Sequence, residues 1–319
     1  MTNYIIRRLM LNAVVLWFVA TIVFFATSVL PGDYVTRQVA QTLEIADQTQ
    51  AIAQARKQLG LDKPLPQRYG DYMVGVIQLD LGSSYETKRT TWEEIGRRLP
   101  ATLELGILIT LVAFGTAIPI GVISAVKQDT WIDVVLRTFA VVNLAVPVFF
   151  AAILMILLVL RFDLFTINVV GAPHFWTNPG EATRLYVIPA LAGGISSGAG
   201  IMRLLRSQML EVMRNDYIRT ARAKGLPDRT VWIRHAVKNA MLPVLTAMGF
   251  TITGIVGGQI ILENMFNIDG LGRFLFRRLI IRDVPPFQGA VLLIAFVIVT
   301  VNLLVDLTYA WLDPRIRYS

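Results

Sequence analysis

The chain has 319 residues, of which 55% are hydrophobic and only 16% are charged, and its formal net charge is +8. This composition is too apolar for a soluble globular domain and predicts an integral membrane protein. Because the chain has no cysteine and only two histidines, it offers neither disulfides nor a cysteine or histidine metal site, and we expect no metal or other cofactor.

Six apolar runs without a charged residue, each at least 18 residues long, follow one another along the chain. Each is long enough to cross a bilayer as a helix, which takes about 20 residues. The runs are Leu9–Leu30, Leu105–Val126, Thr138–Leu160, Leu185–Met202, Asn239–Leu262 and Val284–Val305. We therefore predict an all-α membrane protein with six transmembrane helices. Four prolines within the runs are predicted to bend or interrupt helices, namely Pro119, Pro147, Pro189 and Pro243.

The first run has an alternative interpretation as part of a cleavable signal peptide, with Arg7 and Arg8 as its positively charged n-region. It is longer than an ordinary signal sequence, and no small-residue cleavage site follows Leu30. We therefore interpret it as a retained helix.

Positive charge lies mainly on one side of the predicted membrane. With the N-terminus placed in the cytoplasm, the inner segments hold 15 Lys and Arg residues, whereas the two short outer segments hold six. The inner segments are 1–8, 127–137, 203–238 and 306–319, and the short outer segments are 161–184 and 263–283. The positive-inside rule then predicts that both termini are cytoplasmic. A sequence pI near 9.9 therefore reflects the membrane face and does not indicate a nucleic-acid partner.

Two connections are too long to be simple turns. The first, residues 31–100, contains a Gln- and Ala-rich stretch from Val35 to Leu59 with helical composition, which Gly60 should end. We predict an external helical subdomain there, serving either as a solvated cap or as a docking surface. The predicted divisions are 1–30 (tail and first helix), 31–100 (external loop subdomain), 101–312 (transmembrane domain) and 313–319 (cytoplasmic tail).

The second long connection, residues 203–238, is basic and lies on the predicted inner side. Short helices broken at Gly225–Pro227 are expected, because glycine permits a left-handed cap and proline suits the start of the next helix. One interpretation is an interfacial helix held by anionic lipid headgroups. That interpretation does not explain the small residues that favour close docking to a protein, which are Thr220, Ala221, Ala223 and Gly225.

Several short motifs in a fixed order resemble one known family over nearly the whole chain. They include Tyr4–Leu9, Leu30–Asp33, Leu59–Pro64, Asp80–Gly82, Arg98–Glu104, Asp216–Gly225, His235–Ala236, Asn239–Pro243, Glu263–Phe266, Gly270–Gly272, Gln288–Gly289 and Asp313–Arg315. The chain resembles the membrane permease subunits of bacterial ABC importers of the dipeptide, oligopeptide and nickel class. Its long first outer loop is similar to that of the first, or B-type, of the two permeases that usually pair in these importers.

The resemblance implies a permease in the bacterial inner membrane that forms half of a translocation pore. It implies four protein partners, namely a second homologous permease, two ATP-binding ATPase subunits and an external solute-binding protein. It also implies that the loop Arg219, Thr220, Ala221, Arg222, Ala223, Lys224 and Gly225 is the helix that couples to the ATPase. Of the family pattern E-A-A-x-x-x-G, only Ala221 and Gly225 match here. Peptides are the favoured cargo, with nickel chelates or short saccharides as alternatives.

Energy coupling must then come from another chain, since no Gly-Lys pair and hence no phosphate-binding P-loop occurs. The main alternative function, an ion-coupled secondary transporter, usually carries acidic residues inside its membrane helices, and the six runs have none. We therefore predict a non-catalytic transport subunit embedded in membrane lipid.

A formal G-x-S-x-G hydrolase motif occurs at Gly194–Gly198, but it lies in a predicted membrane helix rather than at a strand-to-helix turn. The same residues form a G-x-x-x-G motif, which lets helices approach closely, and the spacing recurs in the fifth run. The predicted helix-packing residues are Gly194, Gly198, Gly254 and Gly258. The sequence alone does not identify substrate-binding residues.

Overall fold

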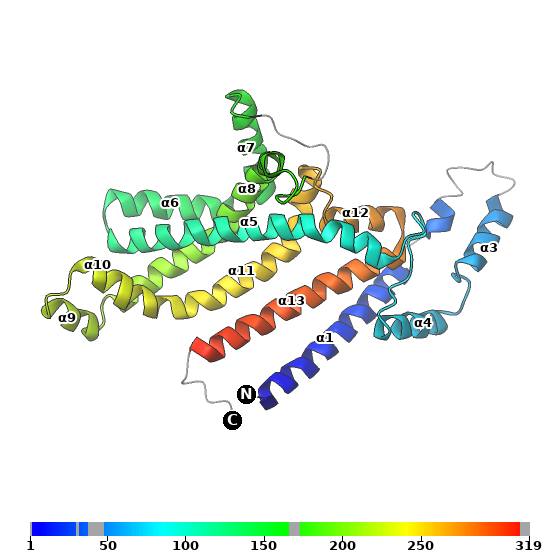
Figure 1. Cartoon of the computed structure of the whole chain (residues 1–319), viewed down its shortest axis with the longest axis horizontal. Helices are drawn as coiled ribbons and strands as arrows, with labels where there is room; N and C mark the ends of the chain where they lie inside the picture. The colour runs from blue at the N-terminus through cyan, green and yellow to red at the C-terminus, as the bar shows by residue number, and fades with distance from the viewer. Residues whose placement is uncertain (1, 30–31, 38–47, 166–172, 313–319) are drawn as a thin grey trace. The chain divides into compact units, whose positions relative to one another are not determined.

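A computed structural model of the chain describes residues 2–29, 32–37, 48–165 and 173–312 (Figure 1). Across these residues the backbone is helical, apart from turns and loops and an isolated β-bridge between Ser83 and Thr90. The predicted all-α fold is confirmed.

Five helices in the described part of the chain are long and apolar enough to cross a membrane. They involve α1 (Thr2–Val29), α5 (Thr91–Val126), α8 (Pro179–Val212), α11 (Lys238–Met265) and α13 (Val284–Leu312). A broken pair, α6 (Trp131–Ala145) and α7 (Val148–Arg161), adds a sixth candidate span if the two helices are counted as one. These spans agree with the six predicted runs.

The third run is not one straight helix, because α6 and α7 meet at an angle of 111°. Val146 has extended backbone angles and Pro147 precedes the first residue of α7. Proline fixes its own backbone and disfavours helical geometry in the residue before it. The predicted interruption by Pro147 is therefore confirmed, whereas Pro189 and Pro243 lie inside continuous helices.

The loop after α1 contains two short helices, α3 (Gln48–Gln58) and α4 (Leu65–Ile77). The predicted helical stretch from Val35 to Leu59 thus includes α3, while residues 38–47 lie outside the described part. Gly60 follows α3 with a φ angle of +66°, which is the left-handed geometry that glycine adopts without strain.

The chain folds into two compact units, and both are assembled from segments that are distant in the sequence. The first combines residues up to Pro100 with Asp269–Val299 and includes α12 (Leu271–Ile281). In this unit the end of α1 and the start of α13 are joined by a hydrogen bond of 2.8 Å from Gln288 Nε2 to Thr27 Oγ1. Its apolar core joins the start of α5 with α12 and α13 through Ile95, Leu271, Phe274, Leu275 and Ala290.

A buried ionic cluster also holds the first unit together, and it consists of Arg278, Glu86, Glu94 and Asp283. Arg278, only 2% exposed, contacts Glu86 and lies 2.9 Å from Asp283 (Nη1 to Oδ2) and 3.8 Å from Glu94 (Nη2 to Oε2). Ser84 Oγ donates a further hydrogen bond of 2.6 Å to Asp283 Oδ2. The cluster thereby ties the loop before α5 to the end of α12.

The second unit combines Ala101–Ile268 with the described residues from 300 to 312, and α8 packs there against α6, α7 and α11. Two apolar cores lie along α8. The first includes Leu105, Ile109, Leu185, Tyr186 and Leu262. The second, toward the end of α8, includes Met202, Leu205, Met209, Ile218 and Ala240.

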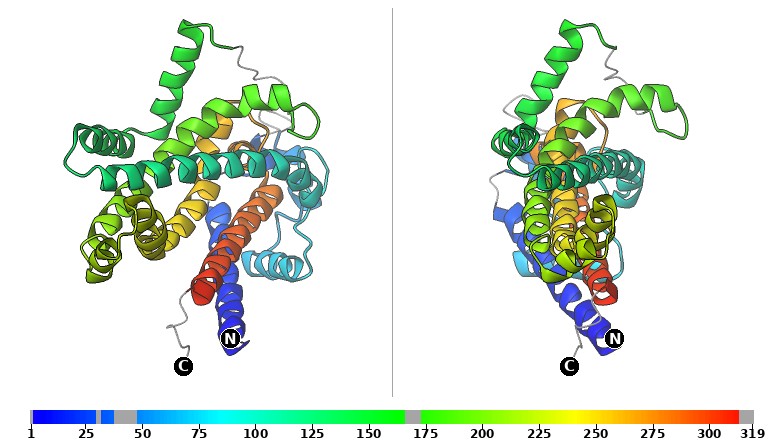
Figure 2. Two further views of the ribbon diagram at one scale, coloured as in Figure 1. Left: turned by 60° about the vertical axis from the view of Figure 1, so that its left-hand side comes forward. Right: turned by 90° about the vertical axis from the view of Figure 1, so that its left-hand side faces the viewer.

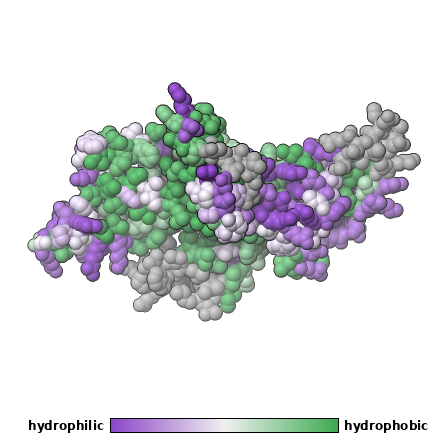
Figure 3. All heavy atoms as spheres, turned by 45° about the horizontal axis from the view of Figure 1, so that its top comes forward, coloured by the Kyte–Doolittle hydropathy of each residue, from purple (hydrophilic) through white to green (hydrophobic). Residues whose placement is uncertain are grey.

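Hydrophobic side chains cover much of the surface of the long helices, as Figure 3 shows for one face. The exposed residues include Leu9, Phe18 and Ile22 on α1 and Leu157 and Leu160 on α7. Large apolar side chains exposed in such number are expected where lipid is the solvent.

Candidate functional site between α8 and α11

The α9 segment, residues 213–237, connects α8 to α11 and contains α9 (Asp216–Ala223), α10 (Asp228–Thr230) and the π-helix η1 (Val231–Val237). Figures 1 and 2 show α9 and α10 together beyond the end of α8 and the start of α11. As predicted, the short helices are broken at Gly225–Pro227.

Two residues on one side of α9 anchor it. Ile218 is completely buried and Ala221 is nearly so, and both belong to the core that also contains Val231 and Ala236 of η1. Because positions three apart lie on the same face of a helix, this pair forms a narrow apolar stripe. Asn239 Nδ2 adds a hydrogen bond of 3.0 Å to the hydroxyl of Tyr217. The rest of α9 is consequently free to face outward.

Gly225 ends α9 in a Schellman motif. The N–H of Leu226 donates to the carbonyl of Ala221 at 3.3 Å, and the N–H of Gly225 donates to that of Arg222 at 2.9 Å. The motif requires a left-handed residue after the helix, and Gly225 has a φ of +78°. A Cβ here would meet no atom within 4 Å, so the demand for glycine comes from the backbone and not from crowding.

Of the seven residues predicted to form the coupling loop, Ala221 is buried and the other six are exposed: Arg219, Thr220, Arg222, Ala223, Lys224 and Gly225. The ion pairs on this surface are long and exposed, at 3.4 Å for both Arg219–Asp216 and Arg222–Asp228. Exposed pairs of this kind contribute little to stability. The outer surface of α9 therefore consists of basic and small side chains, and its inner surface packs into the apolar core through Ile218 and Ala221.

A buried ion pair lies where α5, α6 and α8 meet, and sequence reasoning did not find it. Asp133 accepts two hydrogen bonds from Arg206, from Nε at 2.8 Å and from Nη2 at 2.7 Å. Ser124 Oγ, at the end of α5, donates another at 2.6 Å. The Thr130-x-x-Asp133 pattern does indicate a helix start, since Thr130 accepts a bond from the Asp133 N–H. No local pattern indicates Arg206, which is 73 residues away.

Two further acidic side chains of the second unit, Glu104 on α5 and Glu263 on α11, accept hydrogen bonds from neighbouring segments. Glu104 accepts hydrogen bonds of 3.0 Å from His174 Nδ1 and from the backbone N–H of Phe175. Thr102 donates a bond of 2.7 Å to the buried Glu263. Among the described residues no cluster of three or more His, Cys, Asp or Glu side chains has metal-site geometry.

The predicted packing glycines have different surroundings. A Cβ on Gly194 would lie 2.5 Å from Val112, and one on Gly198 would lie 2.6 Å from the carbonyl oxygen of Ala113, so α8 approaches α5 closely at both. A Cβ on Gly254 would meet nothing within 4 Å, and what surrounds Gly258 lies outside the described part of the structure. Gly121 and Gly249, which were not predicted, also lie where a Cβ would crowd a neighbouring helix.

Ser196, the centre of the formal hydrolase motif, lies inside α8. It is not at the strand-to-helix turn on which a serine nucleophile depends, and His174 instead contacts Glu104. The motif therefore does not build an active site.

Long apolar helices with hydrophobic outer surfaces, joined by an exposed basic segment between two of the spans, define a polytopic membrane protein. Comparison with known families makes the class specific. Residues 1–106 match the N-terminal component and residues 117–318 the main component of one family. The chain belongs to the binding-protein-dependent transport system inner membrane components.

Curated relatives match over the full length of both chains. The chain is 37% identical over 341 residues to the dipeptide transport system permease protein DppB of Escherichia coli strain K12. It is 38% identical over 321 residues to the glutathione transport system permease protein GsiC of Salmonella typhimurium. It is thus a multi-pass inner-membrane permease of an ABC importer and a non-catalytic subunit, and the alternative of an ion-coupled secondary transporter is set aside.

Proposed function

We propose that this permease forms half of the pore of an importer for small peptides. The observation that carries the proposal is the full-length similarity to permeases named for dipeptide and glutathione transport. Glutathione is itself a tripeptide, so both names describe short peptides with free carboxylates. The other half of the pore is a second, homologous permease, two ATPase subunits drive the cycle, and an external solute-binding protein delivers the peptide.

In this proposal α9 is the coupling helix, and residues 219–225 contact the ATPase. The apolar stripe of Ile218 and Ala221 packs α9 against η1, and η1 packs against α11. A displacement of α9 by the ATPase would therefore be transmitted to the start of α11. The pair Asp133–Arg206 separately joins α6 to α8. Rigid, closely packed elements of this kind transmit a displacement to the helices that line the pore.

Gly225→Asp in the assembled importer tests the coupling role. The left-handed φ of Gly225 costs about 1–2 kcal/mol for an L-residue, and a carboxylate adds negative charge to a basic surface. We expect at least a tenfold loss of both transport and binding-protein-stimulated ATP hydrolysis, with the complex still assembled. Thr220→Asp is the matched control, because it adds the same charge to α9 at a position that does not need a left-handed backbone. An assembled Gly225→Asp importer with unchanged activity would refute the role of α9.

Orientation is part of the same proposal: both termini and the α9 segment are cytoplasmic, and α3 is external. The observation behind it is the excess of Lys and Arg on the inner segments. Since the chain has no cysteine, Gln50→Cys and Asp228→Cys can be compared directly. An impermeant thiol reagent added to intact cells should label position 50 and spare position 228, and the reverse pattern would invert the topology.

The division of the chain follows from this orientation. Residues 31–100 act as an external loop subdomain, 101–312 as the transmembrane domain and 313–319 as a cytoplasmic tail. Purified alone and reconstituted into vesicles, the chain should accumulate no peptide, because the partner permease and the ATPases are missing.

A further inference from the structure

Helix α4, in the loop after α1, leaves one apolar side exposed. Gly70, Val74 and Ile77 follow one another at spacings of four and three residues, so they lie on the same side of the helix. All three are exposed, Val74 by 53% and Ile77 by 78%. We call these three residues the apolar side of α4, and the function proposed above makes no use of it.

The remainder of the α4 surface is different. Tyr69 and Tyr72 are partly buried and their rings face α1. Gln67, Asp71 and Gln78 are exposed and form a polar side next to the apolar one, because consecutive residues of a helix are turned by about 100°. One buried, one apolar and one polar side are expected of a helix that lies at the boundary between lipid and water.

The contacts with α1 place α4 beside the membrane-spanning part of that helix (Figure 1). The ring of Tyr69 lies 5.3 Å from that of Phe24 and 5.5 Å from that of Phe25. Its hydroxyl is hydrogen-bonded to Thr21 Oγ1 at 2.9 Å. At ~1.5 Å per residue, Thr21 lies about 12 Å before the end of α1 at Val29. Tyr69 therefore reaches into the depth of the span.

The segment after α4 is also attached to membrane-spanning helices. Trp92 Nε1, at the start of α5, donates a hydrogen bond of 2.7 Å to the carbonyl of Leu79, and both side chains are largely exposed. A Cβ on Gly289 of α13 would lie 2.5 Å from Thr91 Cγ2, so the start of α5 packs against the apolar run of α13. Tryptophan is enriched where the apolar core of a bilayer meets the headgroups, and Trp92 is typical of that position.

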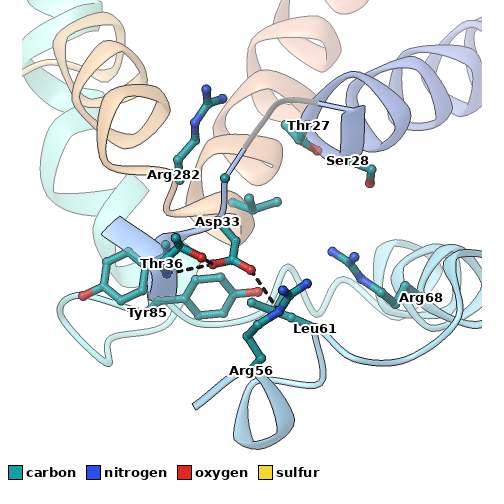
Figure 4. Close-up of a pocket in the computed structure, with 12 residues that line it drawn as sticks. Thr27, Ser28, Asp33, Thr36, Arg56, Leu61, Arg68, Tyr85 and Arg282 are labelled. Carbon is teal, nitrogen blue, oxygen red and sulfur yellow. Dashed lines mark hydrogen bonds and ion pairs between the residues drawn. The ribbon is translucent and has the colours of Figure 1, made fainter. Parts of the chain in front are cut away.

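Polar groups gather on the side of α4 that is opposite Ile77. Arg68 precedes Ile77 by two and a half helical turns, so the two side chains leave the helix in opposite directions. Arg68 lines a polar cavity of about 210 Å³ together with Asp33 and Arg56, which form an ion pair at 3.2 Å (Figure 4). The helix therefore separates a polar region from an apolar one.

Lipid is the occupant that these observations favour for the apolar side. Phe25, which contacts Tyr69, is itself 42% exposed on α1, as are Phe18 and Ile22 by larger fractions. The exposed apolar residues of α4 thus continue the lipid-facing surface of α1.

We propose that α4 is an interfacial helix: its apolar side lies among the acyl chains of one leaflet, and its polar side faces water. With the orientation proposed above, this is the outer leaflet, and only the choice of leaflet rests on that proposed function. The subdomain of residues 31–100 is then anchored on the membrane surface through α4.

Spin labels on single cysteines test this proposal in the assembled importer, since the chain has no cysteine of its own. The other subunits are made free of cysteine, and the complex is reconstituted into vesicles of phosphatidylethanolamine and phosphatidylglycerol. Gly70→Cys and Ile77→Cys place the label on the apolar side; a Cβ at Gly70 meets no atom within 4 Å. Asp71→Cys and Gln78→Cys, each one residue further along, are the matched controls on the polar side.

Two reagents that collide with the label distinguish its surroundings. Oxygen concentrates among acyl chains, whereas chromium oxalate stays in water. We expect the ratio of oxygen to chromium oxalate collisions to be at least about threefold higher at positions 70 and 77 than at 71 and 78. Unchanged ATP hydrolysis shows that each labelled importer is assembled.

A charge on the apolar side provides a second measurement. Ile77→Asp should raise the collision rate of chromium oxalate with a label at position 70 several-fold, because a carboxylate among acyl chains is costly. Gln78→Asp adds the same charge on the polar side and should leave that rate unchanged.

The alternative occupants give different results. Water on the apolar side would make all four positions equally accessible to chromium oxalate, and a partner protein there would lower collisions with both reagents at 70 and 77. Either result overturns the proposal. Collision rates do not depend on the leaflet, so an inverted topology would refute the proposed orientation and leave the contact with lipid intact.

Discussion

The ionic cluster of the first unit and the α9 segment of the second both contain many charged residues, but they use them in opposite ways. Around Arg278 the charges are buried and paired, so they fix the loop before α5 against α12. On α9 the charges are exposed and weakly paired, and two apolar residues hold the helix in place. Charge therefore serves stability in the first region and remains available for a partner in the second.

Arg278→Ala should have the largest effect on stability. It leaves the buried carboxylate of Asp283 without its cation, whereas Glu94 keeps its ion pair with Arg98. Breaking a buried pair in this way costs about 3–5 kcal/mol. A lowered unfolding temperature of the purified chain in detergent measures the loss. Arg277→Ala, one residue away but exposed, should change the unfolding free energy by no more than about 1 kcal/mol. Similar losses in both variants would show that burial does not distinguish the two arginines.

Ile218→Ala should come next, because it removes the main apolar anchor of α9. Truncating a buried isoleucine to alanine costs about 2–5 kcal/mol in well-packed cores, and the end of a short helix lies at the lower end of this range. Protease sensitivity of the α9 segment should rise together with the loss of unfolding temperature. Ile233→Ala in η1 is the matched control, since Ile233 is 56% exposed. If Ile233→Ala loosened α9 equally, the apolar stripe would not be its anchor.

Gly198→Val should destabilise the second unit by overpacking. The added side chain would meet the backbone of Ala113 on α5, and crowding of this kind costs about 1–3 kcal/mol. Gly254→Val has open space around its Cβ position and serves as the control. Unfolding temperatures of the two variants in the same detergent provide the comparison. A larger loss for Gly254→Val would show that close helix approach is not the role of Gly198.

Arg219→Ala should have the smallest effect on stability, at most about 0.5 kcal/mol, because its ion pair with Asp216 is exposed. ATP hydrolysis by the assembled importer should nevertheless fall several-fold if Arg219 contacts the ATPase. Comparing the unfolding temperature with the hydrolysis rate separates the two effects. A parallel fall in both would place Arg219 among the structural residues instead.

Much of the fold could be predicted because its signals are local. Uncharged runs indicated the spans, and the Gly225–Pro227 break followed from backbone preferences of single residues. The 111° bend at Pro147 could be located but not measured, since neighbouring helices determine the angle. The pairing of Asp133 with Arg206 and of Arg278 with Glu86 could not be predicted. These two contacts join residues far apart in the chain, and one sequence without homologues carries no signal of such proximity.

The π-helical turn at Val231–Val237 has a consequence for chain length. In an α-helix, residues five apart point about 140° away from each other. In η1 both Val231 and Ala236 are nevertheless buried, because a π-turn takes up an additional residue in each turn. Deleting one residue from an ordinary α-helix rotates the residues after it by about 100°, whereas the π-turn accommodates one additional residue without this rotation. The π-turn therefore adds one residue to the connection between α9 and α11 while Val231 and Ala236 both stay in the same apolar core.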